Sequence, residues 1–287
     1  MICLALVALG VSACGAGDAP AERGILDRFE PDPRHAERDR SKMQDDGCLV
    51  KTDDTRVRAC VYGKRDSQKT VVLFGDSLAM AYFPAIEELA NRRGWRLVGI
   101  TKMGCPPVLT PLYSHRRERT YRECAQWRFK ALRRIERERP DLIFVTGRMS
   151  TPATKSGQEL GPRRSRPKLE DGYTEVLRRL RATGARVVAF KDLPRSPRNV
   201  PDCVVKHPTN LKKCEFGITP KNAVGFDAAA AAEAGVELID LTPVLCPHGR
   251  CKSVIDDKVV FRDFDHMTPT FARTLAAPIE RRLGSSP

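Results

Sequence analysis

The chain has 287 residues, of which 41% are hydrophobic and 30% are charged. This composition can fill a core, and it excludes both a wholly disordered chain and a fibrous repeat. The formal net charge of +14 attracts polyanions without choosing among nucleic acid, anionic lipid and acidic envelope polymers. No apolar run approaches the ~20 residues that a membrane-spanning helix needs, so a polytopic membrane protein is excluded as well.

The N-terminus begins with a short apolar run, Ile2 to Ala13, which Cys14 follows. The run is too short for a membrane span and is typical of a signal peptide. Its last residues resemble a bacterial lipobox, in which the cysteine is lipidated. We therefore expect residues 1–14 to be a signal peptide, Cys14 to be the lipidation site, and the chain to be exported. No Lys or Arg precedes the run, and a buried N-terminal strand or helix is the alternative.

Residues 15–47 are rich in Arg, Asp, Glu, Pro and Ala and contain few large apolar side chains. This composition predicts a linker or a loosely packed arm. We expect one folded domain to follow it, over residues 48–287.

The chain has ten cysteines, and eight remain when Cys3 and Cys14 are set aside with the signal peptide. The eight lie as neighbours in sequence: Cys48 with Cys60, Cys105 with Cys124, Cys203 with Cys214, and Cys246 with Cys251. Eight cysteines allow 105 connectivities, so this pairing is a hypothesis. Metal binding is the competing interpretation, but no C-x-x-C occurs and the histidines do not cluster near the cysteines. Four disulfides and an oxidising compartment are favoured.

From Cys48 onward the pattern alternates between short apolar runs and helical spacing. Buried strands are predicted at Val71–Phe74, Arg96–Thr101, Asp141–Gly147, Arg186–Phe190 and Val236–Asp240. Helices are predicted at Leu78–Asn91, at 120–138, 170–183 and 222–234, and after Thr268-Pro269, with Pro278 kinking or ending the last one. Buried strands joined by helical crossovers predict an α/β fold, namely a single three-layer α/β/α domain with a five-stranded parallel sheet.

The predicted helix at 120–138 shows how the positive charge is carried. Its aromatic residues Tyr121, Trp127 and Phe129 fall on the apolar arc, and its basic residues fall opposite. Binding of nucleic acid would require aromatic side chains on the basic face for stacking. We therefore interpret the basic face as a solvated surface and expect no nucleic-acid partner.

The first predicted strand runs directly into Gly75-Asp76-Ser77-Leu78 and a helix. A serine on such a turn stands at the carboxyl end of a parallel sheet, where open α/β folds place their sites. The helix N-terminus offers N–H groups to a developing oxyanion. Taken alone, the motif fits a helix-capping serine equally well.

A second motif changes this balance, because Asp263 and His266 are three residues apart just before the last predicted helix. A serine nucleophile needs a base to take its proton, and the base needs an acid that fixes its tautomer. An Asp-x-x-His turn can supply both. The two motifs together predict nucleophilic catalysis by Ser77.

These motifs resemble the SGNH or GDSL hydrolases, and most of all the SGNH domains that are fused to, or work beside, membrane acyltransferase-3 proteins. The resemblance covers roughly residues 48–283. It rests on CVYG at 60–63, FGDSL at 74–78, TKMGCPP at 101–107, LCPHGRC at 245–251 and FRDFDHMT at 261–268. It implies a flavodoxin-like fold, Ser77 as nucleophile, His266 as general base and Asp263 as its orienting acid. It also implies an oxyanion hole made by the backbone N–H groups of Ser77 and Gly104.

The sequence departs from this family at one place. SGNH enzymes commonly carry Gly-x-Asn-Asp after the third strand, with the Asn side chain in the oxyanion hole, but here Gly147-Arg148-Met149-Ser150 stands there. Losing one such donor typically costs ~10²–10³ in kcat. Arg148 is a candidate substitute in the oxyanion hole, and an arginine merely salt-bridged at the sheet edge is the alternative.

The resemblance implies an exported serine-dependent O-acyl esterase or O-acyltransferase that acts on acyl groups of cell-envelope glycans or glycolipids. It implies no metal and no cofactor, a monomer held at the membrane by its lipid anchor, and an acyltransferase-3 protein as a possible acyl supplier. The alternative is a non-catalytic envelope polyanion-binding lipoprotein on the same scaffold. The basic stretch 151–168 either borders the site and meets an acidic polymer or is a solvated loop.

Overall fold

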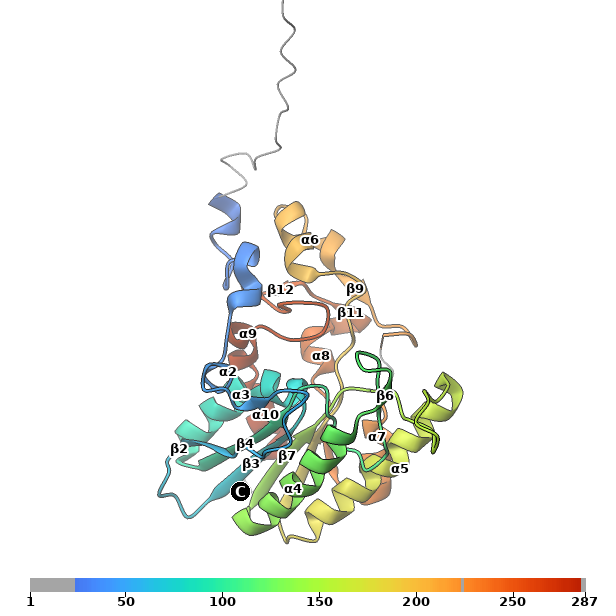
Figure 1. Ribbon diagram of the computed structural model, residues 1–287. Coiled ribbons are helices and arrows are strands. Elements are labelled where there is room, and N and C mark those ends of the chain that lie inside the picture. The colour runs from blue at the N-terminus through green and yellow to red at the C-terminus, as the bar shows by residue number, and fades with distance from the viewer. Residues whose placement is uncertain (1–23, 223–224, 285–287) are drawn as a thin grey trace, which may run out of the picture.

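The computed structural model describes residues 24–222 and 225–284 (Figure 1). The predicted signal peptide and Cys14 lie outside these residues. A seven-stranded sheet has the order β1-β4-β3-β7-β8-β10, and β2 also pairs with β4. Its strands are β1 (Leu49–Val50), β2 (Cys60–Gly63), β3 (Thr70–Gly75), β4 (Arg96–Lys102), β7 (Leu142–Thr146), β8 (Arg186–Phe190) and β10 (Glu237–Ile239).

The five predicted strands are confirmed as β3, β4, β7, β8 and β10, and all of them are parallel. The other two strands share the outer edge of β4. There β2 runs antiparallel along Arg96–Gly99, and β1 runs parallel to Thr101–Lys102. The sheet therefore has seven strands instead of five. The additions are short edge strands without a long apolar run, which is why the hydrophobic pattern does not show them.

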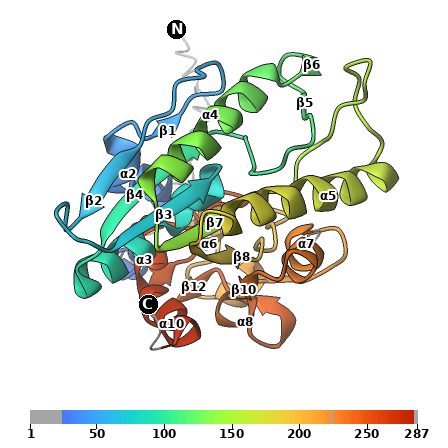
Figure 2. The same cartoon turned by 90° about the horizontal axis from the view of Figure 1, so that it is seen from below.

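The two faces of the sheet pack into two separate cores. Alternate strand residues divide between them: Val71 and Leu73 face one core, and Val72 and Phe74 face the other. Figure 2 shows helices α4 and α5 on one side of the sheet and helices α3 and α10 on the other. The predicted three-layer α/β/α arrangement is thus confirmed. The helices of the two layers are α3 (Ser77–Arg93), α9 (Pro269–Thr274) and α10 (Ala276–Leu283) on one side and α4 (Arg122–Glu138), α5 (Pro162–Arg181) and α7 (Asp227–Ala234) on the other.

Short elements surround the carboxyl edge of the sheet. The helical ones are η1 (Pro33–Arg38), α2 (Lys42–Asp45), α6 (Val200–Lys206), η2 (Leu211–Cys214), α8 (Thr242–Leu245) and η3 (Pro247–Gly249). The two-residue strands pair as β5 (Tyr113–Ser114) with β6 (Arg119–Thr120), β9 (Phe216–Gly217) with β11 (Arg250–Cys251), and β12 (Val254–Ile255) with β13 (Lys258–Val259).

Three details differ from the predicted helices. Helix α5 begins at 162, eight residues earlier than expected, and it takes part of the basic stretch 151–168 into its first turns. The last helix breaks at Leu275, where α9 ends and α10 begins, and Pro278 lies inside α10. In α4 the Phe129 side chain is 55% exposed and the neighbouring Arg128 is buried. The guanidinium of Arg128 hydrogen-bonds to the carbonyl oxygens of Pro106 and Thr110, which explains how the core accepts it.

The N-terminal segment is packed more tightly than its composition suggests. Leu26, Phe29, Ala36 and Met43 are buried and belong to the core beneath α3 and α9. The expectation of a loosely packed arm is therefore wrong for residues 24–47. A few apolar side chains, spaced between the charged residues, are enough to hold this segment on the domain.

The four neighbouring cysteine pairs are joined as disulfides, as the sequence predicted. Cys48–Cys60 ties β1 to β2, and Cys203–Cys214 ties α6 to η2. Among the described residues, no helix combines the length and apolar character that crossing a bilayer would require.

Candidate active site

The candidate site lies at the carboxyl end of β3, where the order in which strands are added to the sheet reverses. The chain passes from β3 to β4 on one side, and β7, β8 and β10 continue on the other. Such a switch point is where open α/β sheets bind their ligands. Gly75 ends β3 at φ +153°, and a Cβ there would lie 1.9 Å from the carbonyl oxygen of Thr146. Only glycine therefore allows β3 to turn so closely past β7.

Ser77 is the first residue of α3, and it does not cap the helix. The cap is Asp76, whose Oδ1 accepts a hydrogen bond of 2.8 Å from the N–H of Leu78. Its Oδ2 accepts another of 2.8 Å from the N–H of Arg148, which joins the ends of β3 and β7. Because Asp76 supplies the cap, the Ser77 hydroxyl is free for another role. The interpretation of Ser77 as a helix-capping serine is wrong.

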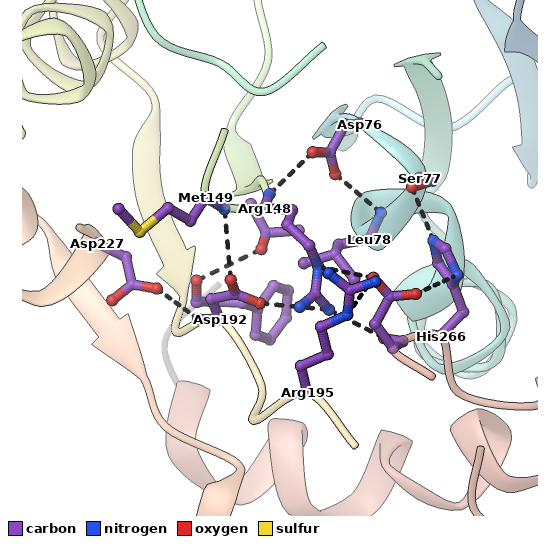
Figure 3. Close-up of polar contacts among 12 residues, drawn as sticks. Asp76, Ser77, Leu78, Arg148, Met149, Asp192, Arg195, Asp227 and His266 are labelled. Atoms are coloured by element: carbon purple, nitrogen blue, oxygen red, sulfur yellow. Dashed lines mark hydrogen bonds and ion pairs between the residues drawn. The ribbon is translucent and has the colours of Figure 1, made fainter. Parts of the chain in front are cut away.

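Ser77, His266 and Asp263 form one hydrogen-bonded chain, and Figure 3 shows its contact between Ser77 and His266. The distance from Ser77 Oγ to His266 Nε2 is 2.8 Å, and His266 Nδ1 lies 2.9 Å from Asp263 Oδ2. Asp263 Oδ1 also accepts hydrogen bonds from the N–H groups of Asp265 and His266. The structure thus brings together the three residues that the sequence singled out, although 189 positions separate the serine from the histidine.

Asp265 gives the imidazole a second acidic neighbour, at 3.1 Å from Oδ1 to His266 Nδ1. Burial alone would lower the pKa of His266, but the hydrogen bonds and charges of Asp263 and Asp265 outweigh burial and raise this pKa to about 9. For Asp263, burial acts to raise the pKa, and the hydrogen bond and charge of His266 prevail and hold it well below its usual range. Both shifts favour the protonated form of His266 beside two ionised carboxylates at neutral pH.

The two backbone groups expected in the oxyanion hole carry no competing partner. Among the described residues, none accepts a hydrogen bond from the N–H of Ser77 or of Gly104. Gly104 is exposed at φ +58°, in the loop after β4, and Cys105 next to it is bonded to Cys124 of α4. This disulfide fixes the loop that presents the Gly104 N–H.

The Arg148 side chain contacts Asp265 and Asp192, not the two backbone N–H groups of the expected oxyanion hole. Its Nη2 donates a 3.0 Å hydrogen bond to the carbonyl oxygen of Asp265 and lies 3.6 Å from Asp192 Oδ1. Its Nε is 3.6 Å from Asp265 Oδ2 and has no hydrogen bond within the part of the chain described. The guanidinium therefore bridges the end of β7 to the loop that carries His266 (Figure 3). This geometry matches the alternative that the sequence left open, an arginine salt-bridged at the edge of the sheet.

Behind Arg148 lie two buried carboxylates that sequence reasoning missed, Asp192 and Asp227. Burial raises the pKa of both, that of Asp192 to about 7 against the opposing charge of Arg148. Asp227 accepts a hydrogen bond from the N–H of Asp192, and Asp192 accepts one from the N–H of Met149. The available signal was position, since Asp192 stands two residues past a predicted buried strand, at the edge of the sheet where Ser77 lies.

Asp263, Asp265 and His266 also offer three possible metal-ligand atoms within 4.8 Å of one another. Both carboxylates, however, face the same imidazole nitrogen, and the other imidazole nitrogen faces Ser77. This arrangement fits the transfer of a proton between serine and histidine better than the joint coordination of a cation.

A serine at the switch point of a parallel sheet, hydrogen-bonded to an acid-supported histidine, defines an α/β protein with a serine-hydrolase-like site. The family model described as "SGNH domain (fused to AT3 domains)" matches residues 47–281, and the chain belongs to this family.

Comparison with solved structures gives the same fold. The periplasmic domain of a lipopolysaccharide acetyltransferase from Salmonella ser. Paratyphi A superposes with a TM-score of 0.57 at 14% identity, over 77% of this chain and 85% of that one. An acetyl xylan esterase gives 0.44 at 15% identity, over 73% and 97%. An acylhydrolase-like protein from Bacteroides fragilis gives 0.41 at 12% identity, over 75% and 86%. No curated protein sequence matches this chain.

Proposed function

We propose that this chain is an exported serine-dependent O-acyl esterase or O-acyltransferase that acts on acyl groups of cell-envelope glycans or glycolipids. The observation that carries the proposal is the unbroken chain of hydrogen bonds from Ser77 through His266 to Asp263. Membership of the SGNH family and the four disulfides support it, because disulfides persist outside the reducing cytosol.

The proposed reaction has two steps. Ser77 Oγ attacks the acyl carbonyl while His266 Nε2 takes the hydroxyl proton, and the N–H groups of Ser77 and Gly104 bind the resulting oxyanion. His266 returns the proton to the departing alcohol, which leaves an acyl ester on Ser77. Water or a sugar hydroxyl then attacks that ester, and His266 passes the attacker's proton back to Ser77 Oγ. None of these steps needs an oxidant, a reductant or a metal.

The identity of the acceptor decides between esterase and transferase. In the transferase case a membrane acyltransferase-3 protein supplies the acyl group, which is the arrangement that the family description suggests. Lipidation at Cys14 would hold the domain beside such a partner.

Two assays test the proposal. A fluorophosphonate probe should label the protein at Ser77, because it reacts only with an activated serine. p-Nitrophenyl acetate should be hydrolysed by the full chain and not by Ser77→Ala, whereas Ser156→Ala, an exposed turn serine, should behave as wild type. A protein that is folded but neither labelled nor active would instead support the non-catalytic polyanion-binding alternative.

A further inference from the structure

A cavity of about 480 Å³ opens beside the catalytic loop, and none of the roles above uses it. One wall comes from η1 in the N-terminal segment and the other from α6, and these two elements pack against each other. Figure 1 shows both elements in the same upper part of the molecule. The volume falls in the range of natural small-molecule sites.

Arg262 connects this cavity to the proposed chemistry. Its side chain lines the cavity and is only 16% exposed, and its Nε lies 3.7 Å from Asp263 Oδ2. Its backbone N–H closes the catalytic turn by donating 3.0 Å to the carbonyl oxygen of His266. A molecule in the cavity would therefore lie one residue away from the acid that holds the histidine.

The polar lining offers both donors and acceptors. Lys206 forms no ion pair with any described residue, and the carboxylate of Asp202 accepts no hydrogen bond from the described part of the chain. Arg34 is held by Asp27 and Asp32, and its Nη1 makes none of these contacts. The exposed Lys206 and Asp202 thus offer a donor and an acceptor at the cavity that have no partner among the described residues.

Three of the other lining residues form an apolar surface, beside the polar Glu37 and Asn199. Pro33 and Pro201 are buried, and Val205 is half-buried beside them. Two prolines cannot rearrange freely, and the disulfide from Cys203 to Cys214 fastens α6. The combination of a fixed apolar surface with mixed donors and acceptors matches a pyranose ring, which has an apolar C–H face and hydroxyls that both donate and accept.

We propose that this cavity binds a saccharide unit of the glycan that carries or receives the acyl group. The proposal rests on the proposed function and deepens it by naming the class of ligand and where it is held. The bound unit would contact Arg262, whose neighbour Asp263 holds the imidazole of His266. It also gives a role to η1 of the N-terminal segment, which forms one wall of the site.

Binding is tested directly on the full chain with two probes, maltotriose as a neutral saccharide and trigalacturonate as an acidic one. Titration calorimetry should detect at least one of them, and Lys206→Gln or Asp202→Asn should weaken that binding by about three- to tenfold. The matched controls are Lys64→Gln and Asp66→Asn. Both residues are exposed and lie in the loop before β3, at the amino end of that strand.

The same variants separate this proposal from the proposed function. Hydrolysis of p-nitrophenyl acetate should not change in Lys206→Gln or Asp202→Asn, because neither residue contacts the triad, whereas acetyl transfer to the saccharide should need a higher saccharide concentration. Binding of neither probe, or binding equal in these variants and wild type, would overturn the saccharide site. Fluorophosphonate labelling of Ser77 would still stand in that case, and its loss would count against the proposed function instead.

Discussion

The imidazole of His266 has two carboxylate neighbours at one nitrogen, and this controls when it can act as a base. Only the neutral ring can accept the proton of Ser77. With a pKa of about 9, roughly 1% of the rings are neutral at pH 7. The kcat/KM for an ester should therefore keep rising through neutral pH and level off only above pH 9. A plateau that begins near pH 6.5 would show that the two carboxylates do not raise the pKa in solution.

The two carboxylates can be told apart by substitution. Asp265→Asn should move the acid limb of the pH profile to lower pH and retain most of the limiting kcat, because Asp263 still orients the ring. Asp263→Asn should move the limb and also lower kcat, since the tautomer is then no longer fixed. The reverse pattern would make Asp265 the orienting acid.

Stability should follow the same titration. The pKa of His266 is higher in the folded chain than the usual ~6.5 of an unfolded chain, so its contribution is complete below that value and is lost as pH rises through about 9. The melting temperature should fall between pH 7 and pH 10 in wild type and fall less in His266→Gln. Equal slopes in the two proteins would remove His266 as the cause.

Two roles are open to Arg148, donation to the oxyanion and a structural contact, and an alanine variant alone does not distinguish them. As an oxyanion donor its loss should lower kcat by ~10²-fold with little change in KM, and Arg148→Lys should rescue poorly. Asp192→Asn leaves the guanidinium in place and removes its buried ionic partner. If kcat falls in this variant too, the buried pair with Asp192 is what holds Arg148 in its working position. If kcat is unchanged while Arg148→Ala is impaired, the loss comes from Arg148 itself, as an oxyanion donor or through its contact with Asp265.

At the residue scale, sequence reasoning found the groups that belong to motifs and missed those that only the fold assembles. Ser77, Asp263 and His266 were identified because each stands in a recognisable local pattern. Asp192 and Asp227 carry no such pattern. The contacts of Asp192 with Arg148 and Met149, and of Asp227 with the N–H of Asp192, follow from the order of strands in the sheet.

Among the elements, the loop after β4 is held in position by one disulfide. Gly104 has φ +58° and precedes Cys105, so the Cys105–Cys124 disulfide anchors the loop to α4 within one residue of a proposed oxyanion donor. Replacing both cysteines by alanine should lower kcat by about tenfold or more, since one misplaced donor weakens binding of the oxyanion. The matched double variant at Cys246 and Cys251, in the turn around η3, should keep its kcat; equal losses in both would point to general destabilisation.

Strands with apolar runs were predictable, whereas the two short strands beside the outer edge of β4 were not. β3, β7 and β8 are buried on both faces, so each contains an uninterrupted run of four apolar residues that is easily recognised. β1 is two residues long, and its place beside β4 is set by pairing that no local pattern encodes. In α4 the helical projection was right for Trp127 and wrong for Phe129, because carbonyl groups of a distant loop accept the buried Arg128.

For the whole molecule, the N-terminal segment is part of the folded domain. Leu26 and Met43 are fully buried, and burial of such a side chain stabilises by about 1.5–3 kcal/mol. A chain that begins at Cys48 should therefore melt at a lower temperature than one that begins at Gly24, as measured by calorimetry. Leu26→Ala in the longer chain should reproduce part of the loss, with exposed Glu37→Ala as its control. Equal melting temperatures for the two chains would contradict this role.

That segment would also set how far the domain can stand from a membrane if Cys14 were lipidated. It joins the fold at β12 and β13, the hairpin that leads into the catalytic loop, through the pairing of Glu30 with Lys258. Gly24 lies ten positions after Cys14, and a chain of that length spans at most about 35 Å. If Cys14 carries a lipid, Ser77 would stay in a thin layer above the bilayer, facing whatever polymer enters it. The length of the tether would then select substrates by their height above the membrane, independently of their chemistry.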